Sequence, residues 1–472
     1  MEVRDSSEAP GPVAQAVRDL ADTASGERFS VVIAGGGVAA LEAVLELRHL
    51  APGISIDLVS PQREFSLRQF SVGQPFGAES PRTLDLAEFC RRNDVTLRKD
   101  HLAEVWGGQY RVLLASGDDI AYDALLLATG ARPKDVLPGA KVFRGPDDVR
   151  DYGAMLGDLE HGRLRHLAFA VPREVRWALP LYELALMTAR LVRARDVHAE
   201  LNFFTHEPAP LMDLGSAAGQ RISEMFEALG IELHCDRAPA VVEHHALRLA
   251  DGHLFDVSEV ISLPALRVPD VPGVTQGRHG FIPTGPTMSV EGMDRVWAAG
   301  DATWFPVKQG GIAAQMADVA AASIVEAAGI GVEVPAFVPV VRGALLTGDE
   351  PEFFSSVVGG GPGQSSAAPL WWPPGKVAGK WLAPYLAREW SGSPEDPLAP
   401  LEARDEGDAE ARARSHREAL DLALRFADVD ANEGEFASAV RWLDIAERLN
   451  LTLPAVWSRK RAHWSEIASS NH

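Results

Sequence analysis

The chain has little cysteine, no long apolar run and a deficit of basic residues, and each shortage excludes a class of protein. Its 472 residues include only two cysteines, Cys90 and Cys235, too few for a disulfide scaffold or a four-cysteine zinc site. No stretch approaches the roughly 18 apolar residues that a membrane-spanning helix needs. The net charge of −21 disfavours binding to nucleic acid or anionic lipid. We expect a cytoplasmic protein without a metal site, in contact with a membrane at most peripherally.

The first motif lies in a segment whose pattern predicts a strand, a turn, a helix and a second strand. The β-branched run at residues 29–34 predicts a buried strand, and residues 38–49 predict a helix rich in Ala, Leu and Glu. Residues 54–59 predict the next strand. Because a glycine turn joins the first strand to the helix, the segment has the βαβ context that a dinucleotide-binding motif requires.

The glycine turn reads Gly35-Gly36-Gly37, with Ala40 three residues further on. We expect Gly35 to permit the tight turn, Gly37 to let the backbone approach a pyrophosphate, and Ala40 to let helix and strand pack closely. The N-terminus of the helix supplies free N–H groups for phosphate oxygens. A purely structural turn is the alternative, which three consecutive glycines disfavour.

The position that should hold an adenosine ribose departs from this motif. An acidic residue usually follows the second strand, whereas here the strand leads into Ser60-Pro61-Gln62-Arg63. We expect Ser60 or Gln62 to donate a weaker hydrogen bond, and Arg63 to lie over the adenine or a phosphate. The alternative for Arg63 is a solvated loop charge.

Two further motifs close buried strands later in the chain. One strand ends in Thr129-Gly130, and a later one runs into Gly300-Asp301. An aspartate at the carboxyl end of a strand is well placed to bind the hydroxyl chain of a ligand. In this order, the three motifs resemble the pyridine nucleotide–disulfide oxidoreductase superfamily of flavoproteins over roughly residues 29–341.

The resemblance implies FAD as cofactor and an α/β fold, in which an FAD-binding Rossmann-like domain is interrupted by a second, NAD(P)-type domain. It implies that the glycine turn holds the FAD pyrophosphate, that Asp301 binds the ribitol chain or a phosphate, and that Thr129 and Gly130 pack near the cofactor, beside Gly300. The expected bounds are 1–28 for a disordered leader, 29–140 and 268–340 for the FAD domain, 141–267 for the second domain, 341–395 for a C-terminal interface segment and 396–472 for a helical tail.

Within that superfamily, residues 305–317 look like the branch of sulfide:quinone oxidoreductases, flavocytochrome sulfide dehydrogenases and type II NADH dehydrogenases. The resemblance implies that the helix after Lys308 points at the pyrimidine edge of the flavin, where a lysine and a helix N-terminus stabilise the charge of the reduced ring. Gln315 takes the place of the glutamine that borders the quinone pocket in these relatives. An ordinary amphipathic helix is the alternative.

The cysteines do not follow the family pattern. Disulfide reductases carry a redox-active cysteine pair, and sulfide oxidisers carry cysteines that flank the flavin, but Cys90 and Cys235 occupy neither position. We expect both to be packed thiols rather than nucleophiles. Sulfide oxidation by the usual mechanism is therefore disfavoured.

The nicotinamide site of the second domain also departs from the family pattern. The loop after the strand at residues 166–171 lacks the expected glycines, and Pro180 and Leu181 carry side chains where a pyrophosphate should approach the backbone. Arg173 and Arg176 can still grip a phosphate. NAD(P)H as a substrate and a degenerate domain that has lost its site both stay open.

The C-terminal region has an unusual concentration of tryptophan and lysine at residues 371–390. Such a cluster suits a peripheral membrane interface, or it covers the core or a contact in a homo-oligomer. The Gly/Pro/Ser-rich residues 359–368 predict a linker, and two tail helices loosely resemble a tetratricopeptide hairpin that could dock a partner.

These features favour an FAD-dependent oxidoreductase that passes two electrons from NAD(P)H or another small donor to a quinone-like or other acceptor. No catalytic acid–base pair is evident, and Lys308 and Gln315 are the residues we expect beside the reacting groups. The alternative is a flavin-binding interaction protein with low turnover, which docks a partner through its helical tail.

Overall fold

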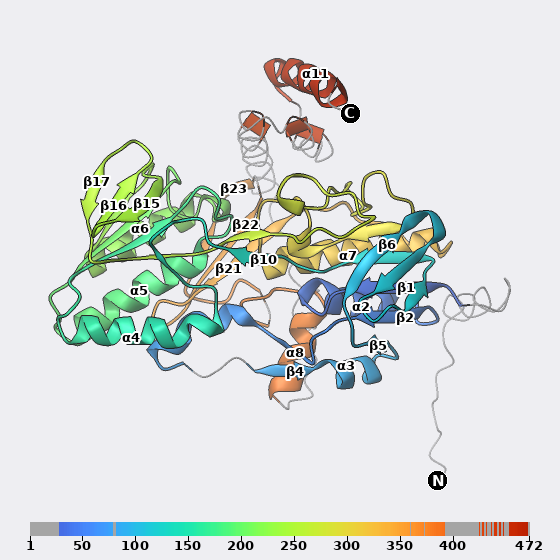
Figure 1. Ribbon diagram of the computed structural model, residues 1–472, viewed down its shortest axis with the longest axis horizontal. Coiled ribbons are helices and arrows are strands. Elements are labelled where there is room, and N and C mark those ends of the chain that lie inside the picture. The colour runs from blue at the N-terminus through green and yellow to red at the C-terminus, as the bar shows by residue number, and fades with distance from the viewer. Residues whose placement is uncertain are drawn as a thin grey trace, which may run out of the picture.

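The computed structural model describes residues 28–78, 82–358, 360–371, 373–391 and 453–470, with scattered residues between 424 and 447. Nearly all of the predicted leader, and most of the predicted tail, lie outside the described residues. Figure 1 shows two α/β lobes side by side, one around the first strands of the chain and one around its green middle part.

The first lobe contains a parallel five-stranded sheet whose strands come from both ends of the first 300 residues. Helices α2 (Val38–Leu50) and α7 (Gly310–Ala327) pack against each other on one face, and a three-stranded antiparallel sheet covers the other. Successive residues of the first strand point to opposite cores, as expected for a strand buried on both faces. The sheet order is β20 (Val296–Ala298), β9 (Ala124–Leu127), β1 (Ser30–Ala34), β2 (Ser55–Val59) and β5 (Thr96–Arg98), and the covering strands are β6 (Leu102–Trp106), β7 (Arg111–Leu114) and β8 (Asp119–Ala121).

The second lobe repeats this architecture with a second parallel sheet. Helices α4 (Val149–Glu160), α5 (Leu179–Ala194) and α6 (Ser216–Leu229) are its helices, and a three-stranded antiparallel sheet packs beside it. The sheet order is β11 (Lys141–Val142), β18 (Glu259–Ser262), β12 (His166–Val171), β13 (Glu200–Thr205) and β14 (Ile231–His234), and the antiparallel strands are β15 (Pro239–Glu243), β16 (Ala246–Leu249) and β17 (Leu254–Asp256).

The chain passes between the lobes twice, and β10 (Arg132–Lys134) pairs there with β19 (Ala265–Arg267). The first sheet is completed only after the second lobe, by β20. This arrangement confirms the predicted fold class, a Rossmann-like domain interrupted by a similar one. The exact domain bounds stay a prediction.

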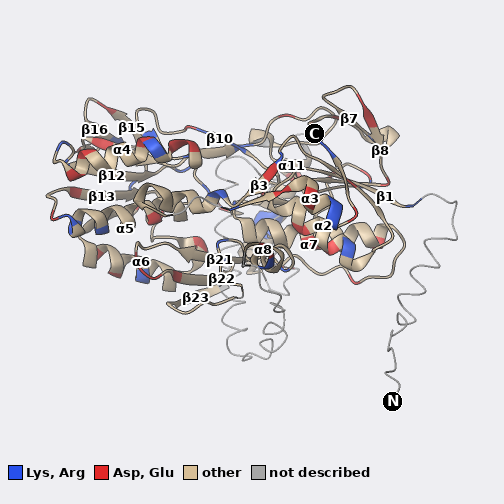
Figure 2. Cartoon of the chain, turned by 90° about the horizontal axis from the view of Figure 1, so that it is seen from below, with Lys and Arg blue, Asp and Glu red and all other residues tan. Residues whose placement is uncertain are grey.

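Charged residues of both signs are interspersed over the two lobes (Figure 2).

Short elements complete the two lobes. The remaining strands and helices are β3 (Glu64–Ser66), β4 (Thr83–Asp85), α3 (Leu86–Arg92), η1 (Arg68–Phe76), η2 (Gly107–Gln109), η3 (Pro146–Asp148), η4 (Met212–Leu214), η5 (Arg278–Gly280) and η6 (Gly300–Ala302).

The linker predicted for residues 359–368 is wrong. β21 (Val340–Leu345), β22 (Glu352–Val357) and β23 (Gly360–Ser366) form an antiparallel sheet that packs on α6. Strand β23 has no apolar alternation because its glycines serve close approach: a Cβ at Gly363 would collide with the carbonyl oxygen of Leu214.

The tryptophan–lysine cluster is largely used inside the protein. Trp371 is only 6% exposed and packs on Phe353, with ring centroids 5.3 Å apart. Lys376 is buried and paired with Glu183, and Lys380 forms an ion pair of 3.2 Å with Glu46. These contacts favour the interpretation that the segment covers the core.

Helix α8 (Leu382–Ser391) follows this segment and packs on α2. Helix α11 (Ala455–Ser470) belongs to the predicted tail, where Arg461 forms an ion pair of 2.6 Å with Glu447. None of the helices in the described part of the chain is long and apolar enough to cross a membrane.

Two glycines test the close approach of β23. Gly230 and Gly363 both have positive φ angles, of 74° and 68°, but a Cβ at Gly230 meets open space. Gly230→Ala should therefore cost only the left-handed strain of about 1 kcal/mol. Gly363→Ala adds the collision and should cost roughly 2–4 kcal/mol. Denaturant unfolding of the two variants measures the difference, and equal costs would contradict the packing role of β23.

Candidate functional site

A cavity of about 1030 Å³ lies where the two lobes and the C-terminal sheet meet. It is lined by the loops at the carboxyl ends of β1, β2, β9 and β20, by the start of α5 and α7, and by β21. Its volume is at the upper end of the range for ligand pockets, so it suits a long ligand. In open α/β sheets, ligands bind at the carboxyl ends of the strands, and this cavity lies at that edge of the first sheet.

The glycine loop between β1 and α2 forms one wall. Gly35 has a φ of 140°, and a Cβ there would collide with the carbonyl oxygen of Ala128 on the neighbouring strand. A Cβ at Gly37, in contrast, would meet no atom within 4 Å, because this residue faces the cavity. Gly35 thus serves the fold, whereas Gly37 leaves space beside a helix N-terminus that a phosphate group can fill.

Gly300 and Asp301 line the cavity beside the first turn of α2, which follows the glycine loop. Gly300 has a φ of 80°, and a Cβ there would lie 3.2 Å from Ala39 and 3.4 Å from Ala313. The absence of that atom lets the β20 loop lie against α2 and α7. Asp301 is partly buried, and burial raises its pKa, an effect that the positive charge of Lys308 opposes.

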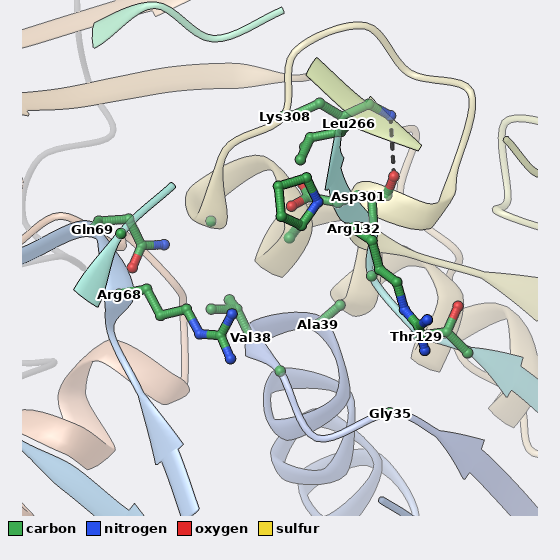
Figure 3. Close-up of a pocket in the computed structure, with 18 of the residues that line it drawn as sticks. Gly35, Val38, Ala39, Arg68, Gln69, Thr129, Arg132, Leu266, Asp301 and Lys308 are labelled. Atoms are coloured by element: carbon green, nitrogen blue, oxygen red, sulfur yellow. Dashed lines mark hydrogen bonds between the residues drawn. The ribbon is translucent and has the colours of Figure 1, made fainter. Parts of the chain in front are cut away.

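Lys308 is only 7% exposed and reaches over the cavity toward Asp301 (Figure 3). Its Nζ donates to the carbonyl oxygen of Thr303 and, at 3.3 Å, to that of Asp301, and it lies 4.1 Å from the centroid of the Phe281 ring. Burial lowers the pKa of Lys308 to about 7. This lysine is therefore poised to change charge near neutral pH.

The other predicted residues of the lining are Ser60, Thr129, Gly130 and Gly36. Ser60 is fully buried, and its Oγ accepts a hydrogen bond of 3.3 Å from the backbone N–H of Gln62. Gly130 has a φ of 68°, and a Cβ there would meet open space. The structure thus brings Gly35, Gly36, Gly37, Ser60, Thr129, Gly130, Gly300, Asp301 and Lys308 to one cavity.

Three predicted site residues do not line it. Ala40 is fully buried beneath the turn, which suits its expected packing role. The Arg63 side chain is 75% exposed and pairs with Asp85 at 3.7 Å, so it is a loop charge. Gln315 needs a correction, because its amide bonds the backbone of Gly311 and Val340 at 2.8–2.9 Å and so ties α7 to β21.

The sequence motifs missed several residues that do line the cavity. Arg68 and Gln69 from η1 point into it (Figure 3), and Glu183, Arg342 and Lys376 line it from other segments. Glu183 is fully buried and forms an ion pair with Lys376. Glu183 lies on the helix that follows the degenerate loop, and Lys376 lies in the tryptophan–lysine cluster, but neither pattern points to a cavity. Arg68, Gln69 and Arg342 belong to segments without any motif.

The two cysteines are unreactive in this environment. Cys90 is 2% exposed, and burial raises the pKa of its thiol to about 11. Burial also raises the pKa of Cys235. Because the thiolate is the nucleophilic form and neither residue lines the cavity, thiol chemistry has no support here.

The second lobe places side chains where a pyridine nucleotide would lie in its usual form. Pro180 lines the cavity, and Leu181 is fully buried. Tyr182 stacks on Phe203, with centroids 4.3 Å apart, and donates to Glu207 at 2.9 Å. Glu207, the acidic residue that follows β13, is thus already bonded within the lobe.

The fold and the site define a protein with two dinucleotide-binding folds that share one cavity. Residues 29–167 match the family described as pyridine nucleotide-disulphide oxidoreductase, and this segment belongs to that family. No curated protein sequence gives a significant match. These findings confirm the predicted family, and with it FAD as cofactor.

Solved structures share the fold at low sequence identity. The sulfide:quinone oxidoreductase of Aquifex aeolicus has a TM-score of 0.67 and 19% identity, covering 80% of this chain and 96% of that one. A ferredoxin reductase from Rhodopseudomonas palustris has a TM-score of 0.53 and 19% identity, covering 71% and 83%. An NAD-dependent persulfide reductase from A. fulgidus has a TM-score of 0.50 and 16% identity, covering 70% and 64%.

Two glycine variants separate folding from cofactor binding. Gly37→Val places its side chain in the cavity, so the protein should fold normally and lose FAD. Gly35→Ala should lower the free energy of unfolding by about 3 kcal/mol, because its Cβ meets a backbone oxygen. Asp301→Ala should weaken FAD binding by about 1–3 kcal/mol. Flavin released on denaturation and thermal unfolding measure both effects; full flavin occupancy in Gly37→Val and Asp301→Ala would show that the site is misplaced.

Lys308 predicts a pH dependence of stability in the cofactor-free protein. Its pKa of about 7 lies below the ordinary 10.5, so the unfolded chain binds more protons between these values. The free energy of unfolding should therefore rise with pH in this window, by up to about 1.4 kcal/mol per pH unit. Lys308→Met removes this contribution. The difference between wild type and variant, measured by denaturant unfolding from pH 7 to 10, should grow with pH, and a constant difference would contradict the prediction.

Proposed function

We propose that this protein is an FAD-dependent oxidoreductase that passes two electrons between a small donor and a small acceptor. The observation that carries the proposal is the open space at Gly37, in a cavity that Asp301 also lines. A structural turn alone would not need that space. The cavity volume of about 1030 Å³ is large enough for a dinucleotide.

The residues present fit FAD. The backbone of Gly36 and Gly37, with the start of α2, would hold the pyrophosphate, and Asp301 would accept hydrogen bonds from the ribitol hydroxyls. Ser60 stands where an acidic residue usually binds the ribose, so we expect weaker contacts at that end. When bound, FAD supplies the two-electron chemistry.

The chain itself supplies charge stabilisation. Lys308 and the N-terminus of α7 place positive charge on one side of the cavity, which favours an electron-rich, reduced ligand. The buried Glu183–Lys376 pair lies at the opposite lobe. Burial raises the pKa of Glu183 and lowers that of Lys376, and each partner opposes the other's shift.

The donor is the less determined half of the proposal. The second lobe keeps the nucleotide-binding fold, which supports NAD(P)H, but its helix begins with Pro180 and Leu181 in place of glycines. The fold likeness to a sulfide:quinone oxidoreductase supports a quinone-like acceptor. A cytoplasmic location, with membrane contact at most peripheral, is part of the same proposal.

The second candidate is a flavin-binding interaction protein that turns over slowly. Helix α11, which packs through Trp464 and pairs Arg461 with Asp444 and Glu447, is the observation that favours it, because a folded tail element can dock a partner. Steady-state turnover with a panel of donors and acceptors distinguishes the two, since an enzyme sustains turnover and a docking protein does not.

Reduction by pyridine nucleotides should be weak. We expect NADH and NADPH to bleach the oxidised flavin with a Michaelis constant at or above about 1 mM, the upper end of typical values. In the Cys90→Ser and Cys235→Ser variants, the flavin should be reduced at the wild-type rate, because both thiols are outside the cavity. Stopped-flow absorbance measures each. Rapid reduction by micromolar NADH would show that the second lobe binds the nucleotide normally, and a loss in Cys235→Ser would restore thiol chemistry.

A further inference from the structure

One end of the cavity is built by the second lobe and the C-terminal sheet, away from the glycine loop. We call it the α5–β21 end. The hydrogen bonds of this region join its segments: the backbone N–H of Leu346 donates to Glu183 Oε1 at 2.8 Å, and Gln309 Nε2 donates to the carbonyl oxygen of Arg342 at 2.9 Å. Its lining residues are Arg176, Trp177, Pro180, Glu183, Gln309, Arg342 and Lys376.

Arg342 is the first unexplained group of this end. Its guanidinium is partly buried, yet it forms no hydrogen bond or ion pair with any described residue. Gln309 holds its backbone, since the amide also accepts from Ile312 N at 2.9 Å and so links β21 to the start of α7. A desolvated, unpaired guanidinium is costly, and its natural partner is an anion that forms charged hydrogen bonds with it.

Glu183 is the second unexplained group. It is fully buried, and while Oε1 binds Leu346 and Lys376, its Oε2 has no hydrogen-bond partner. A buried acceptor without a partner points to a ligand that brings an N–H or O–H group. The oxygen therefore marks the place of a donor on the ligand.

The charge at this end is opposite to that of the whole protein. Lys376 and Glu183 cancel each other, which leaves the positive charge of Arg342 without a counter-charge among the described residues. The chain as a whole has 66 acidic and 45 basic residues. A positive end of a cavity in such an acidic protein selects ligands by their negative charge.

We propose that the α5–β21 end binds a small organic anion, whose carboxylate, sulfonate or phosphate pairs with Arg342 and whose N–H or O–H donates to Glu183. The proposal rests on the proposed function, because it names the chemical class of the substrate that exchanges electrons there. Arg342 then determines specificity, and Glu183 orients the bound anion.

The experiment compares two anthraquinones that both carry an N–H donor and differ in the anionic group, 1-aminoanthraquinone-2-sulfonate and the neutral 1-aminoanthraquinone. Calorimetry gives the dissociation constant of each for the FAD-loaded full chain. Arg342→Gln should raise that of the sulfonate by about 10- to 100-fold, the worth of one charged hydrogen-bonded pair, and change that of the neutral compound less than about 2-fold. Arg342→Lys, which keeps the charge, should bind the sulfonate with a dissociation constant between those of the wild type and Arg342→Gln.

The matched control is Arg267→Gln, which removes the same charge from an exposed position on β19 outside the cavity lining. It should leave both dissociation constants unchanged. If Arg267→Gln weakens binding of the sulfonate as much as Arg342→Gln does, the effect comes from general electrostatic attraction. If Arg342→Gln weakens binding of both compounds equally, Arg342 has only a structural role. Either result overturns the proposal.

Two further arms separate the source of the anion and the fate of the proposed function. If NADH binding shows the same dependence on Arg342 as the sulfonate, the recognised anion is a nucleotide phosphate and the small-anion proposal is overturned. Protein that takes up no FAD sinks the proposed function, but the sulfonate titration of that same protein still tests Arg342.

Discussion

Helices α2 and α7 approach each other and the β20 loop through residues that lack bulky side chains, and the cavity depends on this approach. A Cβ at Gly300 would lie 3.2 Å from Ala39 on α2 and 3.4 Å from Ala313 on α7. Interiors packed this tightly give way only by moving backbone, because no flexible side chain can yield. The same contact sets Asp301 beside the first turn of α2, so the geometry of the cofactor site follows from the absence of a few side-chain atoms.

How much of this could be predicted depends on whether local sequence or distant packing determines an element. The buried strand β12 is predicted at its observed bounds, residues 166–171, because a continuous apolar run between turn residues is sufficient to define it. Strand β23 could not be predicted, because its glycines are there for the close approach of Leu214, a residue about 150 positions earlier. Its pairing comes from β22, not from its own pattern.

The site residues divide in the same way. Gly35, Gly37 and Asp301 carry motifs whose spacing predicts their place, and the structure brings them together. Gln315 matches a motif of the relatives, but its amide already donates hydrogen bonds to the backbone carbonyl oxygens of Gly311 and Val340. A motif specifies a position on a helix; which group the side chain meets depends on the strand packed against it.

The C-terminal segment shows what a cluster of tryptophan and lysine leaves open. The sequence allows a membrane interface or a cover for the core, and the partners that favour the cover lie far earlier in the chain: the backbone N–H groups of Trp381 and Leu382 both donate to Glu42 at 2.7 Å. Burial raises the pKa of Glu42 to about 7, an effect these two bonds oppose. Its carboxyl therefore sits at the N-terminus of α8, where negative charge is favoured.

The second lobe completes the argument about where specificity lies. A Rossmann-like sheet is held by its buried strands, so its nucleotide loop can lose its glycines without cost to the fold. Here Pro180, in the first turn of α5, lines the cavity where the motif would have a glycine, and Glu207 is bonded within the lobe. We therefore infer that the substrate is recognised mainly by groups outside the nucleotide motif, above all Arg342 on β21. The sequence carries no motif for this residue, because its side chain serves a ligand and not the fold.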